Sequence, residues 1–314
     1  MGNTSYIWYD KRIKGKRWDA LMEIGIIGSG AVGLLSAAYL SKYHEVTLYT
    51  RRKEQADLIN NAGITLVRGE RHENISINLG AEENTSYKEP LLIITVKQYQ
   101  LDSILDALKK SPSKTVLFLQ NGMSHIPLLQ TLKRHHIFVG TVEHGALKLS
   151  DNSVKHTGLG CIKVSSLYPD DCLTELPILQ MQMEHFPFEY ISDWKEMMSR
   201  KLLVNACINP LTALLRVPNG ELASNPMFNK MTESVFRESM KVLALQKGQE
   251  EWEHVMDICR ITAQNRSSML KDIEEGRKTE IDGIIGCLIN QAEAEKLEVP
   301  VLHFLYNAIR GMEG

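Results

Sequence analysis

A glycine-rich turn near the start of the chain constrains the fold more than any other feature of the sequence. Gly28-Ser29-Gly30-Ala31-Val32-Gly33 has the pattern GxGxxG, and it follows a strand-like apolar run, Glu23–Ile27. A helical pattern, Ala31–Lys42, and a second strand pattern, Glu45–Tyr49, come directly after it. In such a unit the first glycine permits the tight turn, the second lets the backbone approach a pyrophosphate, and the third lets the helix pack on the strand. The turn therefore predicts a parallel α/β sheet with a dinucleotide at the start of its first helix.

The end of the second predicted strand indicates which dinucleotide is bound. Enzymes that use NAD usually carry Asp or Glu there, which binds the ribose 2′-hydroxyl. This chain has Tyr49-Thr50-Arg51-Arg52 instead. A guanidinium binds a 2′-phosphate through charge-assisted hydrogen bonds, whereas a carboxylate would repel it. We therefore expect NADP as the cofactor, with Arg51 on its 2′-phosphate; the alternative is that the two arginines only form a solvated loop.

The order of the patterns predicts two domains. Strand-like runs at 91–96, 115–119, 137–142 and 161–165 alternate with helical segments and extend to about Tyr190. Beyond Ser192, helix-like periodicity covers 193–216, 227–247, 251–275 and 280–296. We predict an α/β fold in which a Rossmann-type, doubly wound domain over residues 22–190 is followed by an all-helical domain over residues 191–314. Residues 1–21 carry five basic side chains and no apolar core, so we expect a dispensable extension rather than a secretory signal.

Composition excludes several classes of protein. The 314 residues have a formal net charge of −2, so no basic face for nucleic acid is expected. The five cysteines are odd in number and form no CxxC pair, and the histidines form no HExxH motif, so neither disulfides nor a metal site is expected. The longest uncharged stretch, 24–40, is interrupted by glycines and does not predict a membrane helix. We expect a cytoplasmic protein with no membrane partner.

A polar stripe marks the second domain. Lys201, Asn205 and Asn209 recur at every fourth position in a segment rich in Leu, Val, Ala, Cys and Ile, so they lie along one face of a helix. Polar groups among apolar neighbours are costly unless a polar ligand or partner meets them. A desolvated lysine can donate a proton near neutral pH, which the alkoxide left by hydride addition to a carbonyl requires. The alternative is an ordinary solvent face whose asparagines cap the helix near Pro210.

Longer motifs give the chain a family resemblance. They are GIIGSGAVG at 25–33, VK at 96–97, QNGM at 120–123, HGA at 144–146, KLLVNACINPLTAL at 201–214, PNGEL at 218–222, NRSSML at 265–270 and TEID at 279–282. With these motifs the chain resembles the ketopantoate reductases (2-dehydropantoate 2-reductases), within the wider group of 6-phosphogluconate-dehydrogenase-like two-domain reductases. The resemblance covers almost all of residues 22–310.

The resemblance implies a role for each matching residue. Gly28, Ser29, Gly30, Ala31, Val32 and Gly33 would hold the pyrophosphate and Arg51 the 2′-phosphate, while Lys97, Asn121 and Ala146 would line the nicotinamide end of the cofactor. Lys201 would be the proton donor. The substrate contacts would be Lys201, Asn205, Asn209, Asn219, Asn265 and Ser268. Glu280 would be the acidic catalytic residue, near both the substrate hydroxyl and the cofactor. Taken without the resemblance, Asn265, Ser268 and Glu280 are each better explained as surface or capping residues than as ligands.

The resemblance also implies an activity, the NADPH-dependent reduction of the 2-keto acid ketopantoate to pantoate in pantothenate and coenzyme A biosynthesis, by a monomer or homodimer. The alternatives are a paralogous reductase of another small 2-keto acid or an imine, and a non-catalytic NADP(H)-binding sensor. Two positions depart from the family pattern, because Arg266 and Glu143 stand where threonine is common. Either could change the charge of the substrate pocket.

Overall fold

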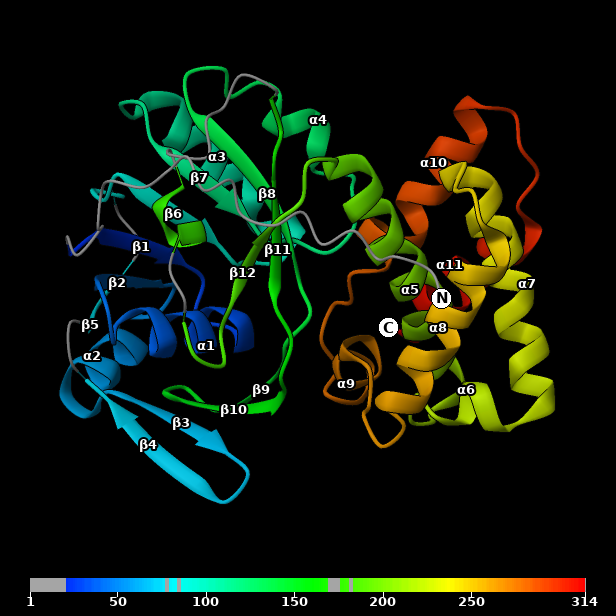
Figure 1. Ribbon diagram of the computed structural model, residues 1–314, viewed down its shortest axis with the longest axis horizontal. Coiled ribbons are helices and arrows are strands. Elements are labelled where there is room, and N and C mark those ends of the chain that lie inside the picture. Colours follow the sequence, from blue (N-terminus) through cyan, green and yellow to red (C-terminus); the bar gives the residue numbers. More distant parts are fainter. Residues whose placement is uncertain (1–20, 77–78, 84–85, 169–175, 181–182, 314) are drawn as a thin grey trace, which may run out of the picture.

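An eight-stranded sheet forms the centre of the N-terminal lobe in the computed structural model, which describes residues 21–76, 79–83, 86–168, 176–180 and 183–313 (Figure 1). Its strand order is β12 (Phe188–Tyr190), β11 (Ile162–Ser166), β8 (His136–Val142), β7 (Thr115–Phe118), β6 (Leu91–Ile94), β1 (Glu23–Ile27), β2 (Glu45–Thr50) and β5 (Leu79–Glu83). The six strands from β8 to β5 are parallel, and β11 pairs antiparallel with β8. The predicted parallel sheet is therefore confirmed.

Both faces of this sheet are buried, which explains why its inner strands appear in the sequence as continuous apolar runs. Alternate residues of β6 and β7 enter different cores: Ile93 and Leu117 pack on one face, and Ile94 and Phe118 on the other. The helices of this lobe are α1 (Ala31–Leu40), α2 (Lys53–Ala62), η1 (Gln98–Gln100), α3 (Leu101–Lys110), α4 (Ile126–Leu129) and η3 (Pro177–Gln180).

A second, smaller sheet was not predicted from the sequence. Its order is β4 (Arg71–Ile75), β3 (Ile64–Arg68), β10 (Ser153–Gly158) and β9 (Gly145–Ser150). Helix α1 packs against strands of both sheets, and its residues from Gly33 to Leu40 are all buried. A helix enclosed on all sides needs no polar face, which accounts for a sequence that is apolar apart from Ser36 and the Tyr39 hydroxyl.

The C-terminal lobe is helical, as predicted. It contains α5 (Trp194–Leu215), α6 (Glu221–Ser224), α7 (Pro226–Leu243), α8 (Gly248–Ile261), α9 (Ser268–Glu274), the π-helical turn η4 (Asp282–Gly286), α10 (Cys287–Ala294) and α11 (Pro300–Met312). The helical pattern over 251–275 is interrupted between α8 and α9, and α11 lies where no helix was predicted. The predicted domain boundary after residue 190 falls between β12 and α5.

Helix α5 joins the two lobes. It packs against α7, α8, α9 and α11 within its own lobe and against β8 and β11 of the large sheet (Figure 1). Most of its side chains are therefore buried, from Met197 to Ala213. Within the described ranges, no helix is both long enough and apolar enough to cross a membrane. Of the predicted N-terminal extension, residues 1–20 lie outside the described residues.

Candidate active site between the two lobes

The glycine turn has the geometry that a pyrophosphate site requires. Gly28 has a φ of +113°, which side chains other than glycine rarely adopt, and it forms the sharp turn after β1. A Cβ at Gly33 would collide with the carbonyl oxygen of Gly28, so only glycine lets α1 approach this closely. A Cβ at Gly30 would meet no atom within 4 Å, which leaves the start of α1 open to a ligand.

The two arginines after β2 have different surroundings. The Arg52 guanidinium forms an ion pair of 2.6 Å with Asp151, at the turn between β9 and β10. The backbone oxygen of Asp151 accepts a hydrogen bond from Gln55 (2.7 Å), and Gln55 in turn accepts one from the hydroxyl of Ser29 in the glycine turn (2.8 Å). The exposed Arg51 makes no hydrogen bond or ion pair with a described residue. Of the two guanidiniums, only that of Arg52 is therefore engaged by a described side chain.

Asn121 connects the lobes. It lies in the loop after β7, where its amide donates a hydrogen bond to Glu280 Oε2 (3.0 Å) and its carbonyl oxygen accepts one from Asn205 on α5 (3.4 Å). Burial raises the pKa of Glu280, whereas the Asn121 amide and the charge of Lys97 act in the opposite direction. Three residues predicted from distant motifs are thus joined by hydrogen bonds.

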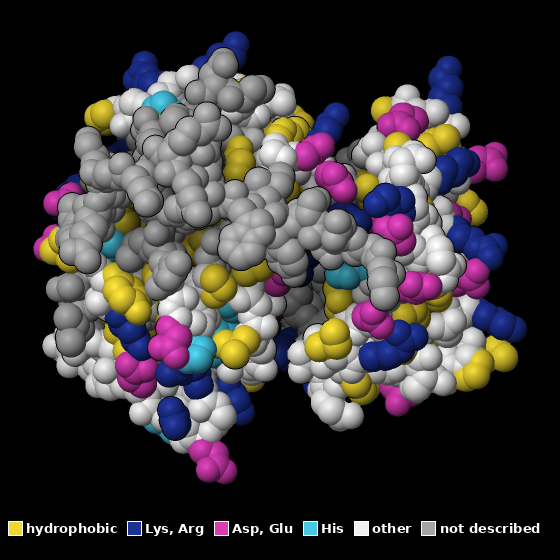
Figure 2. All heavy atoms as spheres, viewed as in Figure 1, with side chains coloured by type: hydrophobic (Ala, Val, Ile, Leu, Met, Phe, Trp, Pro, Cys, Tyr) yellow, Lys and Arg dark blue, Asp and Glu magenta, His cyan; other side chains and the backbone are white. Residues whose placement is uncertain are grey.

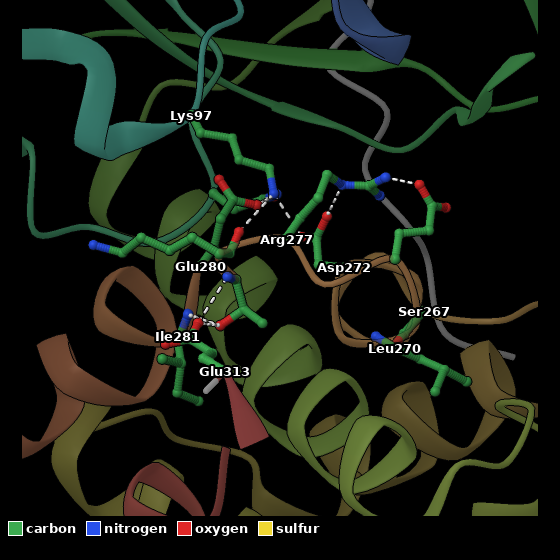
Figure 3. Close-up of polar contacts among 12 residues, drawn as sticks. Lys97, Ser267, Leu270, Asp272, Arg277, Glu280, Ile281 and Glu313 are labelled. Atoms are coloured by element: carbon green, nitrogen blue, oxygen red, sulfur yellow. Dashed lines mark hydrogen bonds and ion pairs between the residues drawn. The ribbon is translucent and has the colours of Figure 1, made fainter. Parts of the chain in front are cut away.

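Lys97 lies at the junction of the lobes, at the start of η1. Its ammonium forms an ion pair with Asp272 on α9 (2.6 Å) and donates a hydrogen bond to the carbonyl oxygen of Lys278 (3.1 Å) (Figure 3). Asp272 is buried and also accepts a hydrogen bond from Arg277 (2.9 Å). The predicted cofactor residue therefore lies against the helical lobe, next to the chain that leads to Glu280.

The segment around Glu280 is held from two sides. Glu313, near the end of the chain, accepts hydrogen bonds from the backbone nitrogen (2.7 Å) and the hydroxyl (2.6 Å) of Thr279 (Figure 3). On the other side, Gly122 approaches Gly283 of the π-helical turn so closely that a Cβ on Gly122 would collide with the Gly283 backbone. Such π turns often occur at functional sites, and this one follows directly after Glu280.

Lys201 is half-buried on α5, and its ammonium makes no hydrogen bond or ion pair with a described residue. Desolvation lowers the pKa of Lys201; the negative charge of Glu143 opposes that shift, and the positive charge of Lys163 adds to it. Asn205 and Asn209 lie one and two turns further along the helix and are about nine-tenths buried. The surface is hollowed between the lobes, as Figure 2 shows. Ala146 on β9 is half-buried.

The remaining predicted substrate residues lie around the start of α9. Asn219 is buried; its amide donates to the Thr262 hydroxyl (2.9 Å), and its backbone nitrogen donates to the carbonyl oxygen of Asn265 (2.9 Å). The side-chain oxygen of Asn219 has no partner among the described residues. Asn265 and Ser268 are exposed. The structure thus brings Asn219 and Asn265 together, and it links neither of them to Lys201 by a hydrogen bond between described residues.

Several residues that shape the site were not identified from the sequence. Ser267 caps α9 by accepting from the backbone nitrogen of Leu270 (3.1 Å), and it accepts a hydrogen bond from Thr212 of α5 (2.8 Å). A serine before a helix is a typical N-cap, so this signal was present in the sequence. Asp272 and Glu313 gave no such signal, because their partners Lys97 and Thr279 lie 175 and 34 positions away in the sequence.

The two departures from the family pattern are each paired with an opposite charge. Arg266 forms an ion pair with Glu274 of α9, and Glu143 forms one with Lys163 of β11 (2.7 Å). Each of these two charges therefore has a partner of opposite sign at its own position.

Comparison with known proteins identifies the family. Residues 24–168 match the family model described as ketopantoate reductase PanE/ApbA, and residues 193–313 match its C-terminal counterpart. The 2-dehydropantoate 2-reductase of Bacillus subtilis is 46% identical over 295 residues, which cover 93% of this chain and 98% of that protein. The chain belongs to the ketopantoate reductase family. The 2-dehydropantoate 2-reductase of Listeria innocua is 40% identical over 297 residues, with 93% and 97% coverage.

Solved structures agree with this membership in the ketopantoate reductase family. The crystal structure of probable 2-dehydropantoate 2-reductase panE from Bacillus subtilis superposes with a TM-score of 0.83 at 45% identity and covers 93% of this chain and 100% of that one. A D-mandelate dehydrogenase solved with NADH and anilino(oxo)acetate gives the same TM-score at 22% identity, with 93% and 98% coverage, and therefore shares the fold. As a member of this family, the chain is an oxidoreductase of the dehydrogenase type.

Proposed function

We propose that this protein reduces the keto group of ketopantoate to give pantoate, with NADPH as the hydride donor, as a cytoplasmic step of pantothenate and coenzyme A biosynthesis. One observation carries the proposal. The two lobes dock so that Asn121 of the nucleotide-binding lobe contacts Asn205 and Glu280 of the helical lobe. Asn205 lies one turn of α5 from Lys201, whose ammonium has no hydrogen-bond or ion-pair partner among the described residues. The motifs that contain Asn121, Asn205 and Glu280 therefore meet at the junction, where a substrate would contact both lobes.

The first lobe fits the expected cofactor. The open backbone at Gly30 and the first turn of α1 would hold the pyrophosphate, and the available guanidinium of Arg51 would hold the 2′-phosphate. Ala146 would line the nicotinamide end, which supplies the hydride when the cofactor is bound. Lys97 would reach the same end from the lobe junction.

Lys201 would donate the proton that the reaction consumes. Hydride addition leaves negative charge on the former keto oxygen, and a partly desolvated ammonium can release a proton more readily than an exposed one. Burial lowers the pKa of Lys201, in accordance with this role. Asn205 and Asn209 on the same face would orient the keto acid, and Asn219, Asn265 and Ser268 would bind its other polar groups.

Glu280 would bind the far hydroxyl of the substrate. Its carboxylate already accepts the Asn121 amide, which fixes the orientation of the carboxylate. The other carboxylate oxygen can accept a second hydrogen bond. A site of this kind should discriminate against a keto acid that lacks the hydroxyl, because the carboxylate would then be left without its partner.

The test is NADPH oxidation by the purified protein with ketopantoate and with trimethylpyruvate, which is ketopantoate without its hydroxyl group. We expect kcat/KM to be about 10- to 100-fold higher for ketopantoate than for trimethylpyruvate, because a hydrogen bond to a charged group stabilises a bound state by about that factor. The Glu280→Ala variant should lose most of this preference. Equal rates with both acids would point to another small 2-keto acid, and no turnover with any keto acid would point to a binding protein.

The role of Lys201 has its own test. Lys201→Ala should lower kcat by about 10²- to 10⁴-fold while NADPH binding is retained, because a positioned general acid contributes about that much. Lys201→Arg keeps the charge but cannot release a proton at neutral pH, so it should be almost as inactive. A normal kcat with a raised KM in Lys201→Ala would make the lysine an anchor for the substrate instead of the proton donor.

A further inference from the structure

We infer that Glu143 and Lys163 act as a charge pair that sets the pH range over which Lys201 can donate its proton. The inference rests on the proposed function, in which Lys201 is the proton donor. Glu143 and Lys163 would be positioning residues, because they act through Lys201.

The pair is built into the edge of the large sheet beside α5. Strands β8 and β11 run antiparallel, with Thr141 opposite Lys163, and the backbone nitrogen of Glu143 donates to the carbonyl oxygen of Cys161 (2.9 Å). This register places Glu143 beside Lys163, and their charged groups are 2.7 Å apart. Helix α5, which carries Lys201, packs on both β8 and β11, and the charges of Glu143 and Lys163 both act on Lys201.

Both oxygens of the Glu143 carboxylate are engaged. Lys163 contacts Oε1, and the thiol of Cys161 donates to Oε2 (3.3 Å). The carboxylate is therefore held in position without a direct ion pair to Lys201. Lys163 also lowers the pKa of Glu143, which keeps this carboxylate ionised.

The charges that face Lys201 oppose one another. Glu143 attracts a proton to Lys201, and Lys163 repels it. Burial together with the neighbouring Glu143 raises the pKa of the Cys161 thiol to about 12, so the thiol stays neutral and adds no charge. Glu189 on β12 contacts the same thiol at 3.8 Å. Glu280, at the other side of the site, interacts with Lys97 and Asp272 instead.

Each member of the pair has a physical task. A lysine desolvated without a nearby negative charge would lose its proton below the working pH and could not serve as an acid. A lysine in direct contact with a carboxylate would hold its proton too tightly to release it. A carboxylate that is already neutralised by Lys163 gives an intermediate attraction, which suits a group that must be protonated at rest and yet donate during turnover.

The protonation of Lys201 determines the direction in which each variant shifts the pH dependence of the rate. The rate falls as the pH rises through the pKa of Lys201, because the deprotonated amine has nothing to donate. Glu143→Gln removes the attraction and should move this fall to lower pH; Lys163→Gln removes the repulsion and should move it to higher pH. At a pH above the midpoint of the wild-type kcat profile, we expect the kcat of Glu143→Gln to be about three- to tenfold lower than that of wild type, and the kcat of Lys163→Gln to be higher by a similar factor. These effects are moderate because the pair is about one-third exposed and solvent partly screens its charges.

Two further variants separate electrostatics from structure. The exchange E143K/K163E restores an ion pair at this edge but puts the positive charge at position 143, whose charge acts more strongly on Lys201. It should keep the low-pH shift of Glu143→Gln, whereas a structural role for the pair predicts that the exchange restores the wild-type profile. Glu189→Gln is the matched control, because it removes a carboxylate beside Cys161 and Lys163 that does not itself act on Lys201, and it leaves both residues of the pair in place. Its profile should match wild type.

A second readout does not depend on catalysis. The signal of Lys201 can be followed directly by NMR titration of protein labelled with ¹³C at the lysine ε-carbons, and assigned by its loss in Lys201→Ala. Opposite displacements of this titration in Glu143→Gln and Lys163→Gln support the inference, and an unmoved titration overturns it. If the titration moves but the kcat profile does not follow it, the charge pair stands and the proposed role of Lys201 as proton donor fails.

Discussion

The ion pair between Lys97 and Asp272 should couple the two lobes energetically. Asp272 is 6% exposed and Lys97 is 29% exposed, and their charged atoms are 2.6 Å apart (Figure 3). A hydrogen bond between charged groups contributes about 1.5–3 kcal/mol when desolvated, whereas an exposed ion pair contributes about 0–1 kcal/mol. Because one partner is buried and the other is partly exposed, we expect a coupling of about 1–2 kcal/mol, between these limits.

The assay is a double-mutant cycle of Lys97→Met, Asp272→Asn and the combined variant. The free energy of unfolding is measured in urea without cofactor, and coincident fluorescence and circular dichroism transitions check that the lobes unfold together. Asp272→Asn should cost more than Lys97→Met, since it leaves both Lys97 and Arg277 without their carboxylate. Arg277→Gln is the control, because it weakens the same carboxylate from within one lobe. A coupling between Lys97 and Asp272 within about 0.5 kcal/mol of zero would refute the reasoning.

Three further predictions concern the cofactor, the acid limit of stability and the site segment. In a binding titration, Arg51→Ala should weaken the affinity for NADPH about 10- to 100-fold and leave the affinity for NADH unchanged. Arg52→Ala should have a smaller effect, because Asp151 already neutralises Arg52. An equal loss of affinity for both cofactors in Arg51→Ala would contradict the assignment. His125 is fully buried, neither ring nitrogen has a partner among the described residues, and burial lowers its pKa to about 4. The unfolded state therefore binds a proton on His125 more tightly than the folded state does, and the free energy of unfolding should fall by up to ~3 kcal/mol as the pH drops from about 6.5 to 4. His125→Phe should reduce this dependence of the unfolding free energy on pH. An unchanged dependence would exclude His125 as its source. Glu313→Ala should raise the KM for ketopantoate several-fold and lower the free energy of unfolding by about 1–2 kcal/mol, because the backbone nitrogen and the hydroxyl of Thr279 both lose their acceptor. Thr279→Ser keeps both donors and should remain close to wild type in both measurements.

Local patterns in the sequence predicted much of the fold and the helix face that carries part of the candidate site. The apolar run 23–27 became β1 with the predicted bounds, because a strand buried on both faces leaves little room for polar residues. The glycine turn shows two of the three reasons for glycine that its spacing implied, namely the positive φ of Gly28 and the close approach of α1 at Gly33. The stripe of Lys201, Asn205 and Asn209 lies on one helix because the period of an α-helix is the same everywhere. The roles of these residues in binding and catalysis stay predictions until the variants above are measured.

Other features depend on contacts between segments far apart in the chain. Strand β3 pairs in parallel with β10, so the small sheet forms only when the hairpin after α2 meets the hairpin after β8. Neither hairpin has a strong alternation, since part of each is exposed to solvent. A short pattern reports how deeply a segment is buried, but it does not report which segment will cover it.

The candidate site shows the same division between sequence and tertiary structure. The sequence alone determined the residue types, namely a turn open to phosphates, an arginine in place of an acid after β2, and a lysine on an apolar helix. Only the docking of the lobes decided that Lys97 meets Asp272, 175 positions away, and that Asn121 meets Glu280, 159 positions away. The physical reason is that the strength of a charge or hydrogen bond depends on how its partner and the surrounding water are arranged, and that arrangement exists only after both cores have formed.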